Sequence, residues 1–276
     1  MNSVCPPFMI TSRIISFYRH CTVFRDLVED LDDYSPEPDR LLDVPFVPSD
    51  DDVVEAMLSL GEVTSKDLVY DLGSGDGRIV ITAAQTRGAR GIGVELDPLR
   101  IADAMEDAGD ARVEYLIDFI EEDIFTVDIS DATVVTLYLL ESVNLQLRPR
   151  LLEELRPGTR ILSHVFKMGD WRADEQFELR VENRRPVNLY KWIVPAQVAG
   201  SWEWEGTEGG RYRVELEQKF QDVTGRAWLD DEAIDLTGAT LCGASLTLQI
   251  QEGKSAPQTF TLNFENNALQ SVWADE

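Results

Sequence analysis

The sequence predicts two folded parts, an α/β domain built on a parallel sheet and an antiparallel all-β domain after it. Three observations lead to this prediction. A glycine-rich turn follows an apolar run within residues 69–77, helix-like and strand-like segments alternate from residue 49 onward, and apolar residues recur at every second position after residue 200. Alternating helices and strands favour a parallel sheet covered on both faces, whereas period-two alternation is typical of antiparallel strands. With 276 residues and 43% hydrophobic content, the chain can bury a sizeable core.

Residues 1–40 are predicted to be an N-terminal extension. Arg13, Arg19 and Arg25 interrupt the apolar residues of its first part, which argues against an export signal. The stretch fits either a short amphipathic helix or a disordered tail, and a targeting role also stays open. The acidic residues 29–33 and two prolines after them indicate a linker.

The α/β domain is predicted to span residues 41–197. Its first helix follows three aspartates, which suit a helix N-terminus, and it carries a buried stripe that begins at Val53. Regular alternation continues to a terminal hairpin whose last strand is reversed. The expected helices are 50–60, 78–87, 98–114 and 145–155; the expected strands are 69–72, 91–94, 117–120, 132–138 and 159–166, with a hairpin of 177–181 and 187–194.

The turn after the first strand carries the strongest functional signal. Asp71 is followed by Gly73, Gly75 and Gly77, and Glu95 closes the next apolar run. Glycines let the backbone approach a ligand without Cβ clashes, and the following helix directs its N-terminus at that ligand. An acid at the end of the next parallel strand is placed to accept the hydroxyls of a ribose. The pattern therefore indicates a nucleoside-binding site.

The glycine spacing selects the class of nucleoside. A dinucleotide site needs G-x-G-x-x-G, but the third glycine would fall on Arg78 or Val80. An acid ahead of the glycines would also repel a pyrophosphate, whereas it suits a cofactor whose tail carries an ammonium group. S-adenosyl-L-methionine has such a tail, so the spacing favours this cofactor.

Several segments resemble known methyltransferases. Residues 71–77 resemble the first motif of the class I methyltransferases, and Glu95 resembles their ribose-binding acid. Other segments are similar to a small family of protein lysine methyltransferases with archaeal and mitochondrial members, namely residues 42–49, 136–140, 156–160 and 163–166. The resemblance covers about residues 42–195. It implies a Rossmann-like seven-stranded methyltransferase sheet, S-adenosyl-L-methionine as cofactor and a lysine-containing protein as substrate.

The strand order and the resemblance together give the candidate site residues. The resemblance selects Asp123, among three neighbouring acids, to accept the adenine amino group, while the next backbone N–H meets a ring nitrogen. The expected cofactor residues are Pro48, Asp71, Gly73, Ser74, Gly75, Gly77, Glu95, Leu96, Asp123 and Ile124. The expected catalytic residues, at or near the ends of the fourth and fifth strands, are Tyr138, Asn144 and His164, and no metal site is expected.

The catalytic candidates differ in how well the sequence supports them. Tyr138 is the best supported, because its ring face and hydroxyl can both steady an incoming amine or cation. His164 fits a structural histidine as well as a base. The N/D-P-P-Y/F motif that DNA adenine and glutamine amide methyltransferases carry at the fourth strand is missing here, which argues against both classes.

Residues 200–276 are predicted to form an antiparallel meander of about seven short strands, arranged as a small open barrel or half-barrel. Glycines separate the alternating segments. Four tryptophans are expected to pack in the core of this part or at its rim: Trp202, Trp204, Trp228 and Trp273. No group of residues in this part indicates chemistry.

Composition limits the partners. The net charge of −26 argues against nucleic acid, since phosphate binding relies on basic patches. The acidity fits a solvated surface, or attraction of a basic substrate. No apolar run approaches a membrane span. An odd, sparse set of three cysteines favours a reduced, cytoplasmic protein, and the oligomeric state stays open.

We therefore expect an S-adenosyl-L-methionine-dependent methyltransferase that acts on lysine side chains of proteins. Two alternatives stay open. One is a small-molecule methyltransferase whose pocket is shaped by the all-β domain, and the other is a non-catalytic binding module built on a methyltransferase fold. The intact acid and glycines of residues 71–77 argue against the second alternative.

Overall fold

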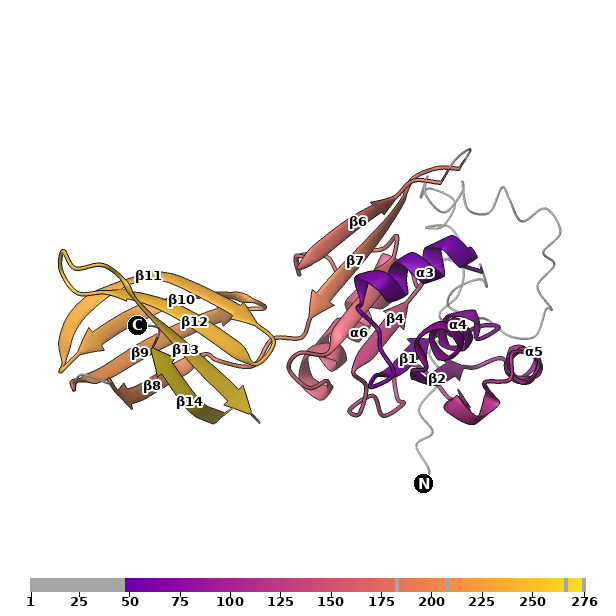
Figure 1. Ribbon diagram of the computed structural model, residues 1–276, viewed down its shortest axis with the longest axis horizontal. Coiled ribbons are helices and arrows are strands. Elements are labelled where there is room, and N and C mark those ends of the chain that lie inside the picture. The colour runs from indigo at the N-terminus through magenta and orange to yellow at the C-terminus, as the bar shows by residue number, and fades with distance from the viewer. Residues whose placement is uncertain (1–47, 182–183, 207–208, 266–267, 275–276) are drawn as a thin grey trace, which may run out of the picture. The chain divides into compact units, whose positions relative to one another are not determined.

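The computed structural model describes residues 48–181, 184–206, 209–265 and 268–274. Within them the chain forms a mixed seven-stranded sheet with helices and then a separate antiparallel sheet of seven strands (Figure 1). The predicted fold class is confirmed. The predictions for residues 1–40 lie outside the described residues.

The first sheet has the strand order β3-β2-β1-β4-β5-β7-β6. Neighbouring strands are parallel except β7, which runs antiparallel to both β5 and β6. The predicted reversed last strand is therefore present. Its strands are β1 (Leu68–Leu72), β2 (Arg90–Glu95), β3 (Ile117–Glu121), β4 (Val134–Leu137), β5 (Arg160–His164), β6 (Glu175–Leu179) and β7 (Val187–Ile193); its helices are α3 (Asp51–Leu60), α4 (Arg78–Arg87), α5 (Pro98–Asp110) and α6 (Glu141–Glu154), with a 3₁₀ turn η1 (Glu114–Leu116).

The core of this part forms where amphipathic helices cover the apolar strands. Helix α3 starts with Asp51 and Asp52 in its first turn, where acids interact favourably with the helix dipole. It buries Val53, Val54, Met57 and Leu58, so the predicted stripe is confirmed. These side chains join buried residues of α4, β1 and β5 in one cluster. This packing fixes the strands whose ends form the site.

Three element boundaries differ from the prediction. Helix α5 ends at Asp110 because the chain turns at Arg112, which has φ of +58°. Strand β5 ends at His164 because Val165 has φ of +67°, which extended strands do not allow. Helix α6 begins at Glu141 and contains Pro149 in its interior, although a proline normally marks the first turn or an end of a helix. The other helices and strands match their predictions within a few residues.

The second sheet is a meander in which each strand pairs with the next along the chain, so that β8 and β14 are its edges. One face buries a core of alternating residues that includes Val214, Leu248 and Phe260. Its strands are β8 (Gly200–Glu205), β9 (Arg211–Lys219), β10 (Asp222–Leu229), β11 (Glu232–Cys242), β12 (Ser245–Gln251), β13 (Gln258–Glu265) and β14 (Ala268–Ala274). The predicted antiparallel meander of about seven strands is confirmed, and its form as an open barrel or half-barrel stays a prediction.

The tryptophans of the second sheet have structural surroundings. Trp204 belongs to the core and Trp202 packs against it, with its ring 5.0 Å from that of Phe264. Trp228 lies under the guanidinium of Arg213, at 4.1 Å from the ring centre. Trp273 is exposed. The first three thus match the expected packing roles.

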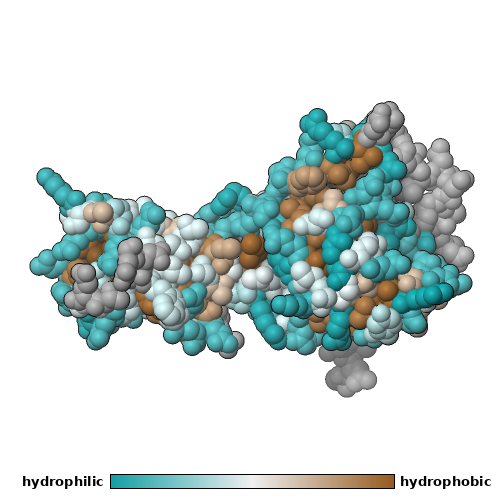
Figure 2. All heavy atoms as spheres, viewed as in Figure 1, coloured by the Kyte–Doolittle hydropathy of each residue, from teal (hydrophilic) through white to brown (hydrophobic). Residues whose placement is uncertain are grey.

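Hydrophilic side chains occupy much of the described surface on the face drawn in Figure 2, with apolar patches between them. None of the described helices is both long enough and apolar enough to cross a bilayer.

Candidate active site

The candidate site lies at the carboxyl ends of β1 and β4, two neighbouring parallel strands in the middle of the first sheet. The strand order reverses between these two strands, and open α/β sheets bind ligands at such switch points. Asp71 of β1 and Thr136 of β4 are partners in the ladder. The Thr136 hydroxyl donates a hydrogen bond of 2.7 Å to Oδ1 of Asp71. The predicted acid is therefore held at the switch point by its neighbouring strand.

Asp71 is buried, with only 3% of its surface exposed. Burial raises the pKa of Asp71 to about 7; the hydrogen bond from Thr136 opposes this rise, and the charges of Asp76 and Glu95 add to it. Because a nearby cation favours the ionised form of a carboxyl group, an ammonium group placed here would lower this pKa again. The site thus favours a positively charged ligand group.

The three glycines after Asp71 adopt backbone conformations that other residues rarely reach. Gly73, Gly75 and Gly77 have φ of +81°, +53° and +74°, within the left-handed region that favours glycine. A Cβ on Gly77 would also lie 2.7 Å from the ring of Phe119. The sequence motif therefore exists because the turn and the packing beneath it both require glycine.

Glu95 at the end of β2 holds this turn together. Its Oε2 accepts the Gly75 N–H at 2.9 Å, and its Oε1 accepts the N–H groups of Leu96 and Asp97 at 2.8 and 3.0 Å. The carboxylate thus positions the glycine turn as well as its own loop. The expected contact with ribose stays a prediction.

The hydroxyl of Ser74 in this turn is available to hydrogen-bond a ligand. This hydroxyl is buried, yet Oγ has no hydrogen-bond partner among the described residues. A Cβ on Gly93, in the strand beside it, would lie only 2.8 Å from that oxygen. Asp71 for an ammonium, Glu95 for ribose hydroxyls and the buried, unpaired hydroxyl of Ser74 in the same turn fit S-adenosyl-L-methionine.

The remaining cofactor candidates are Pro48, Leu96, Asp123 and Ile124. Asp123 accepts the backbone N–H of Phe125 at 2.8 Å, and the carbonyl of Ile124 accepts from Arg150 at 2.9 Å. Leu96 is 45% exposed, and Pro48 is exposed at the start of the described chain. Their contacts with the cofactor stay predictions.

Tyr138 and His164 meet at the ends of β4 and β5. Their ring centres are 3.8 Å apart, and Nδ1 of His164 lies 3.0 Å from the hydroxyl oxygen of Ser49. Burial lowers the pKa of His164 to about 4, and burial together with the charge of Asp50 raises the pKa of Tyr138 to about 12. Both side chains are therefore uncharged at neutral pH.

Asn144 lies deeper than a residue that contacts the substrate directly. Its side chain is fully buried in α6, with Nδ2 3.4 Å from Oγ of Ser163 and 3.3 Å from the carbonyl oxygen of Lys167. These contacts favour a role in positioning the loop after β5. A direct catalytic role of Asn144 stays a prediction.

Sequence reasoning missed three residues of this region. Thr136 had a visible signal, since it is the hydroxyl residue in an apolar strand next to the one that carries Asp71. Ser49 contacts His164 across 115 positions of sequence, and its carbonyl accepts from Arg78 at 2.7 Å. Phe166 lies beside Tyr138, with ring centres 6.5 Å apart. The last two depend on long-range packing that no local pattern indicates.

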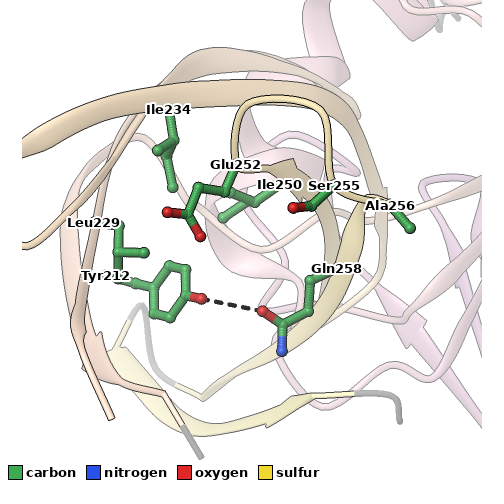
Figure 3. A pocket seen from close by; sticks show the side chains of 8 residues that line it. All are labelled: Tyr212, Leu229, Ile234, Ile250, Glu252, Ser255, Ala256 and Gln258. Carbon is green, nitrogen blue, oxygen red and sulfur yellow. Dashed lines mark hydrogen bonds between the residues drawn. The ribbon is translucent and has the colours of Figure 1, made fainter. Parts of the chain in front are cut away.

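The second sheet contains a cavity of about 90 Å³ whose side chains are drawn in Figure 3. Leu229, Ile234 and Ile250 form its apolar wall, and the Tyr212 hydroxyl donates to Oε1 of Gln258 at 3.1 Å. Glu252 is the one carboxylate that lines it. The cavity has no nucleophile paired with a base. No cluster of three metal-ligating side chains occurs anywhere in the described part of the chain.

Comparisons with known proteins agree with this geometry. Residues 71–175 match the family model of the ANTKMT methyltransferase domain. A protein-lysine N-methyltransferase of Saccharolobus islandicus is 43% identical over 152 residues, which are 55% of this chain and 94% of that protein. The mouse adenine nucleotide translocase lysine N-methyltransferase is 35% identical over 130 residues, and the match spans 47% of this chain and 56% of that enzyme.

A solved structure extends the comparison to the fold. It is titled an RNA methyltransferase from Salinibacter ruber in complex with S-adenosyl-L-homocysteine. It is 49% identical, with a TM-score of 0.52, and the match covers 55% of this chain and 96% of that one. Because the Saccharolobus relative is matched over nearly its whole length, the similarity includes a complete domain. This chain therefore belongs to the family of that protein-lysine N-methyltransferase and is an S-adenosyl-L-methionine-dependent methyltransferase.

Proposed function

We propose that this methyltransferase transfers methyl groups to the ε-amino groups of lysine residues in protein substrates. The observation that carries the proposal is the uncharged ring pair at the ends of β4 and β5, where the half-buried Tyr138 packs on the buried His164, in a chain related to lysine methyltransferases. A protonated lysine has no lone pair to attack with, and an apolar surface favours the neutral amine. This surface suits an amine acceptor.

The residues of the chain have separate tasks in this reaction. When bound, the cofactor supplies an activated methyl group on a sulfonium. Asp71, Glu95 and the glycine turn are expected to bind its tail and ribose. Tyr138 is expected to align the amine: as the nitrogen forms its bond to the methyl carbon, the carbon–sulfur bond breaks, its electron pair stays on sulfur, and the nitrogen then loses a proton to solvent. Such transfer needs alignment and exclusion of water more than a strong base.

The charge of the chain supports a basic protein as the partner. With 51 acidic and 25 basic residues, the surface attracts lysine-rich proteins and increases their rate of encounter. The three cysteines support a reducing, cytoplasmic location, which we include in the proposal. The all-β part from residue 200 is proposed to be a separate domain, after the catalytic domain of residues 41–197.

RNA is the second candidate acceptor, because the solved relative from Salinibacter ruber is titled an RNA methyltransferase. The net charge of −26 opposes it, since RNA binding releases counterions through many basic contacts. We therefore expect lysine, not RNA, to receive the methyl group.

One experiment compares the acceptors directly. The purified chain is incubated with labelled cofactor and with separate protein, RNA and small-metabolite fractions of a lysate from its own organism. We expect label in the protein fraction, on lysine when digested and analysed by mass spectrometry. Label confined to RNA, to a metabolite or to another residue type would refute the proposal and leave the cofactor assignment intact.

A further inference from the structure

A strained turn follows β5 at the active-site edge. Val165 has φ of +67° and is the only β-branched residue at positive φ among the described residues. The Phe166 N–H donates to the carbonyl of His164 at 2.8 Å, so the chain reverses within three residues. Such strain persists only where surrounding contacts fix it, and it concentrates at functional sites.

Two layers of hydrogen bonds hold the turn in place. The Val165 N–H donates to the carbonyl of Asn188 in β7 at 2.8 Å, and the Ser163 hydroxyl donates to the carbonyl of Phe166 at 2.7 Å. The buried amide of Asn144 lies behind them, with Nδ2 3.4 Å from Oγ of Ser163. Asn144 and Ser163 thus stabilise a backbone conformation that Val165 alone would avoid.

The turn determines where the Phe166 ring lies. If β5 continued, residue 166 would lie about 7 Å beyond His164 along the strand, at ~3.3 Å a residue. Instead, Phe166 lies beside Tyr138, with ring centres 6.5 Å apart, while His164 packs on the same tyrosine at 3.8 Å. Phe166 is only partly buried. Its ring can therefore meet a ligand that approaches Tyr138.

We propose that Phe166 determines acceptor specificity: its ring and that of Tyr138 form the apolar wall against which the acceptor lysine side chain lies. Val165, Ser163 and Asn144 are positioning residues for this ring. The inference rests on the proposed function, since an alkylamine is the acceptor. Two aromatic rings would bury the methylene groups of lysine and reduce the hydration of its amine, and the lower hydration favours the neutral, reactive form.

The test measures methyl transfer to lysine in the protein fraction of the lysate, together with S-adenosyl-L-homocysteine binding by calorimetry. The full chain is compared with Phe166→Ala, Phe166→Tyr and Val165→Gly. Phe177→Ala is the matched control, because Phe177 is an exposed phenylalanine on β6 of the same sheet. Thermal unfolding of each variant is recorded.

We expect Phe166→Ala to lower the lysine methylation rate about 10-fold or more at low acceptor concentration, with cofactor affinity within about twofold of the wild type. Phe166→Tyr keeps the ring and should stay within about threefold. Val165→Gly should keep the rate within about threefold of the wild type without lowering the unfolding midpoint, because glycine adopts the positive φ of this turn without strain. A residue that only supports folding would instead reduce cofactor binding and the unfolding midpoint together.

The possible outcomes separate the two proposals. If the wild type methylates lysine and folded Phe166→Ala does so at an unchanged rate, the inference about Phe166 is wrong and the proposed function stands. If Phe177→Ala loses as much activity as Phe166→Ala, the inference is also overturned. If the wild type labels no lysine in any protein, the proposed function fails, and the assignment of Phe166 fails with it.

Discussion

Replacing Asp71 by asparagine should stabilise the cofactor-free protein and weaken cofactor binding at the same time. Burial raises the pKa of Asp71 from 3.8 to about 7, so the folded state binds this proton more tightly than the unfolded state does. The stability that this group contributes is therefore fully present below pH 3.8 and is lost as the pH rises through about 7. Above pH 7 the folded protein contains a buried carboxylate whose charged neighbours in the described structure, Asp76 and Glu95, are acids.

The structure sets the size of the effect. The difference between the ordinary pKa of 3.8 and the folded-state pKa of about 7 for Asp71 means that ionising this group destabilises the folded state by about 4 kcal/mol at most. Asparagine keeps an oxygen for the Thr136 hydroxyl but buries an amide N–H₂ group, which costs about 1–3 kcal/mol if unpaired. We expect a net gain of about 1–3 kcal/mol in unfolding free energy at pH 8, or roughly 2–10 °C in Tm. Losing the charged contact to the cofactor ammonium should weaken binding by about 10- to 100-fold.

The assay is thermal unfolding of the wild type and Asp71→Asn at pH 5 and pH 8, with calorimetry of S-adenosyl-L-methionine binding at each pH. The gain in Tm should be larger at pH 8 than at pH 5, and the wild type should lose cofactor affinity below pH 7, as binding must first remove a proton. Asp118→Asn, at an exposed acid of β3, is the control for net charge. A lower Tm for Asp71→Asn at pH 8, or unchanged cofactor affinity, would refute the reasoning.

Three further predictions test the site and the domain division. Glu95→Ala should weaken S-adenosyl-L-homocysteine binding by at least about 1–3 kcal/mol, because two ribose hydrogen bonds are lost. It should also lower the Tm of the free protein, because Glu95 accepts three backbone N–H groups; an unchanged Tm in calorimetric scans would contradict this structural role. Tyr138→Ala should lower turnover much more than cofactor affinity in paired kinetic and binding measurements, and equal losses would contradict an aligning role. A chain that ends near Pro195 should fold and bind cofactor. Its Tm should be lower, because Trp171 loses its stacking with Phe220. An insoluble product without cofactor binding would show that the all-β part belongs to the catalytic core.

The cofactor turn could be predicted from the sequence because its constraints are local. Positive φ at residues 73, 75 and 77 demands glycine, so the backbone conformation is visible as a sequence pattern. The parallel sheet and its reversed last strand were expected from regular alternation and from family resemblance, and the structure confirms both. The hydrogen bonds that Glu95 accepts from the turn were not predictable, since a carboxylate that binds ribose and one that binds backbone N–H groups look the same in sequence.

The acceptor side could be predicted less completely because long-range contacts form it. Tyr138 and His164 follow adjacent strands, and their proximity was expected. Phe166 was not expected to lie there, because Val165 reads as a continuation of the strand and only its positive φ ends β5. Asn144 was expected to lie near the acceptor; its buried position in α6, which begins earlier than predicted, was not expected, and its catalytic role stays a prediction.

The two sides of the site handle charge in opposite ways. On the cofactor side, Asp71 and Glu95 are the carboxylates expected to meet a cationic ligand, and burial, with the charges of Asp76 and Glu95, raises the pKa of Asp71. On the acceptor side, burial keeps His164 neutral above about pH 4, and burial with the charge of Asp50 keeps Tyr138 neutral below about pH 12. Negative charge near the cationic cofactor would favour its binding, whereas a carboxylate beside the lysine would stabilise its protonated, unreactive form. An acidic surface that attracts lysine-rich proteins would thus be compatible with catalysis only if the amine meets uncharged rings at the end of its path, which is the role that we propose for Tyr138 and Phe166.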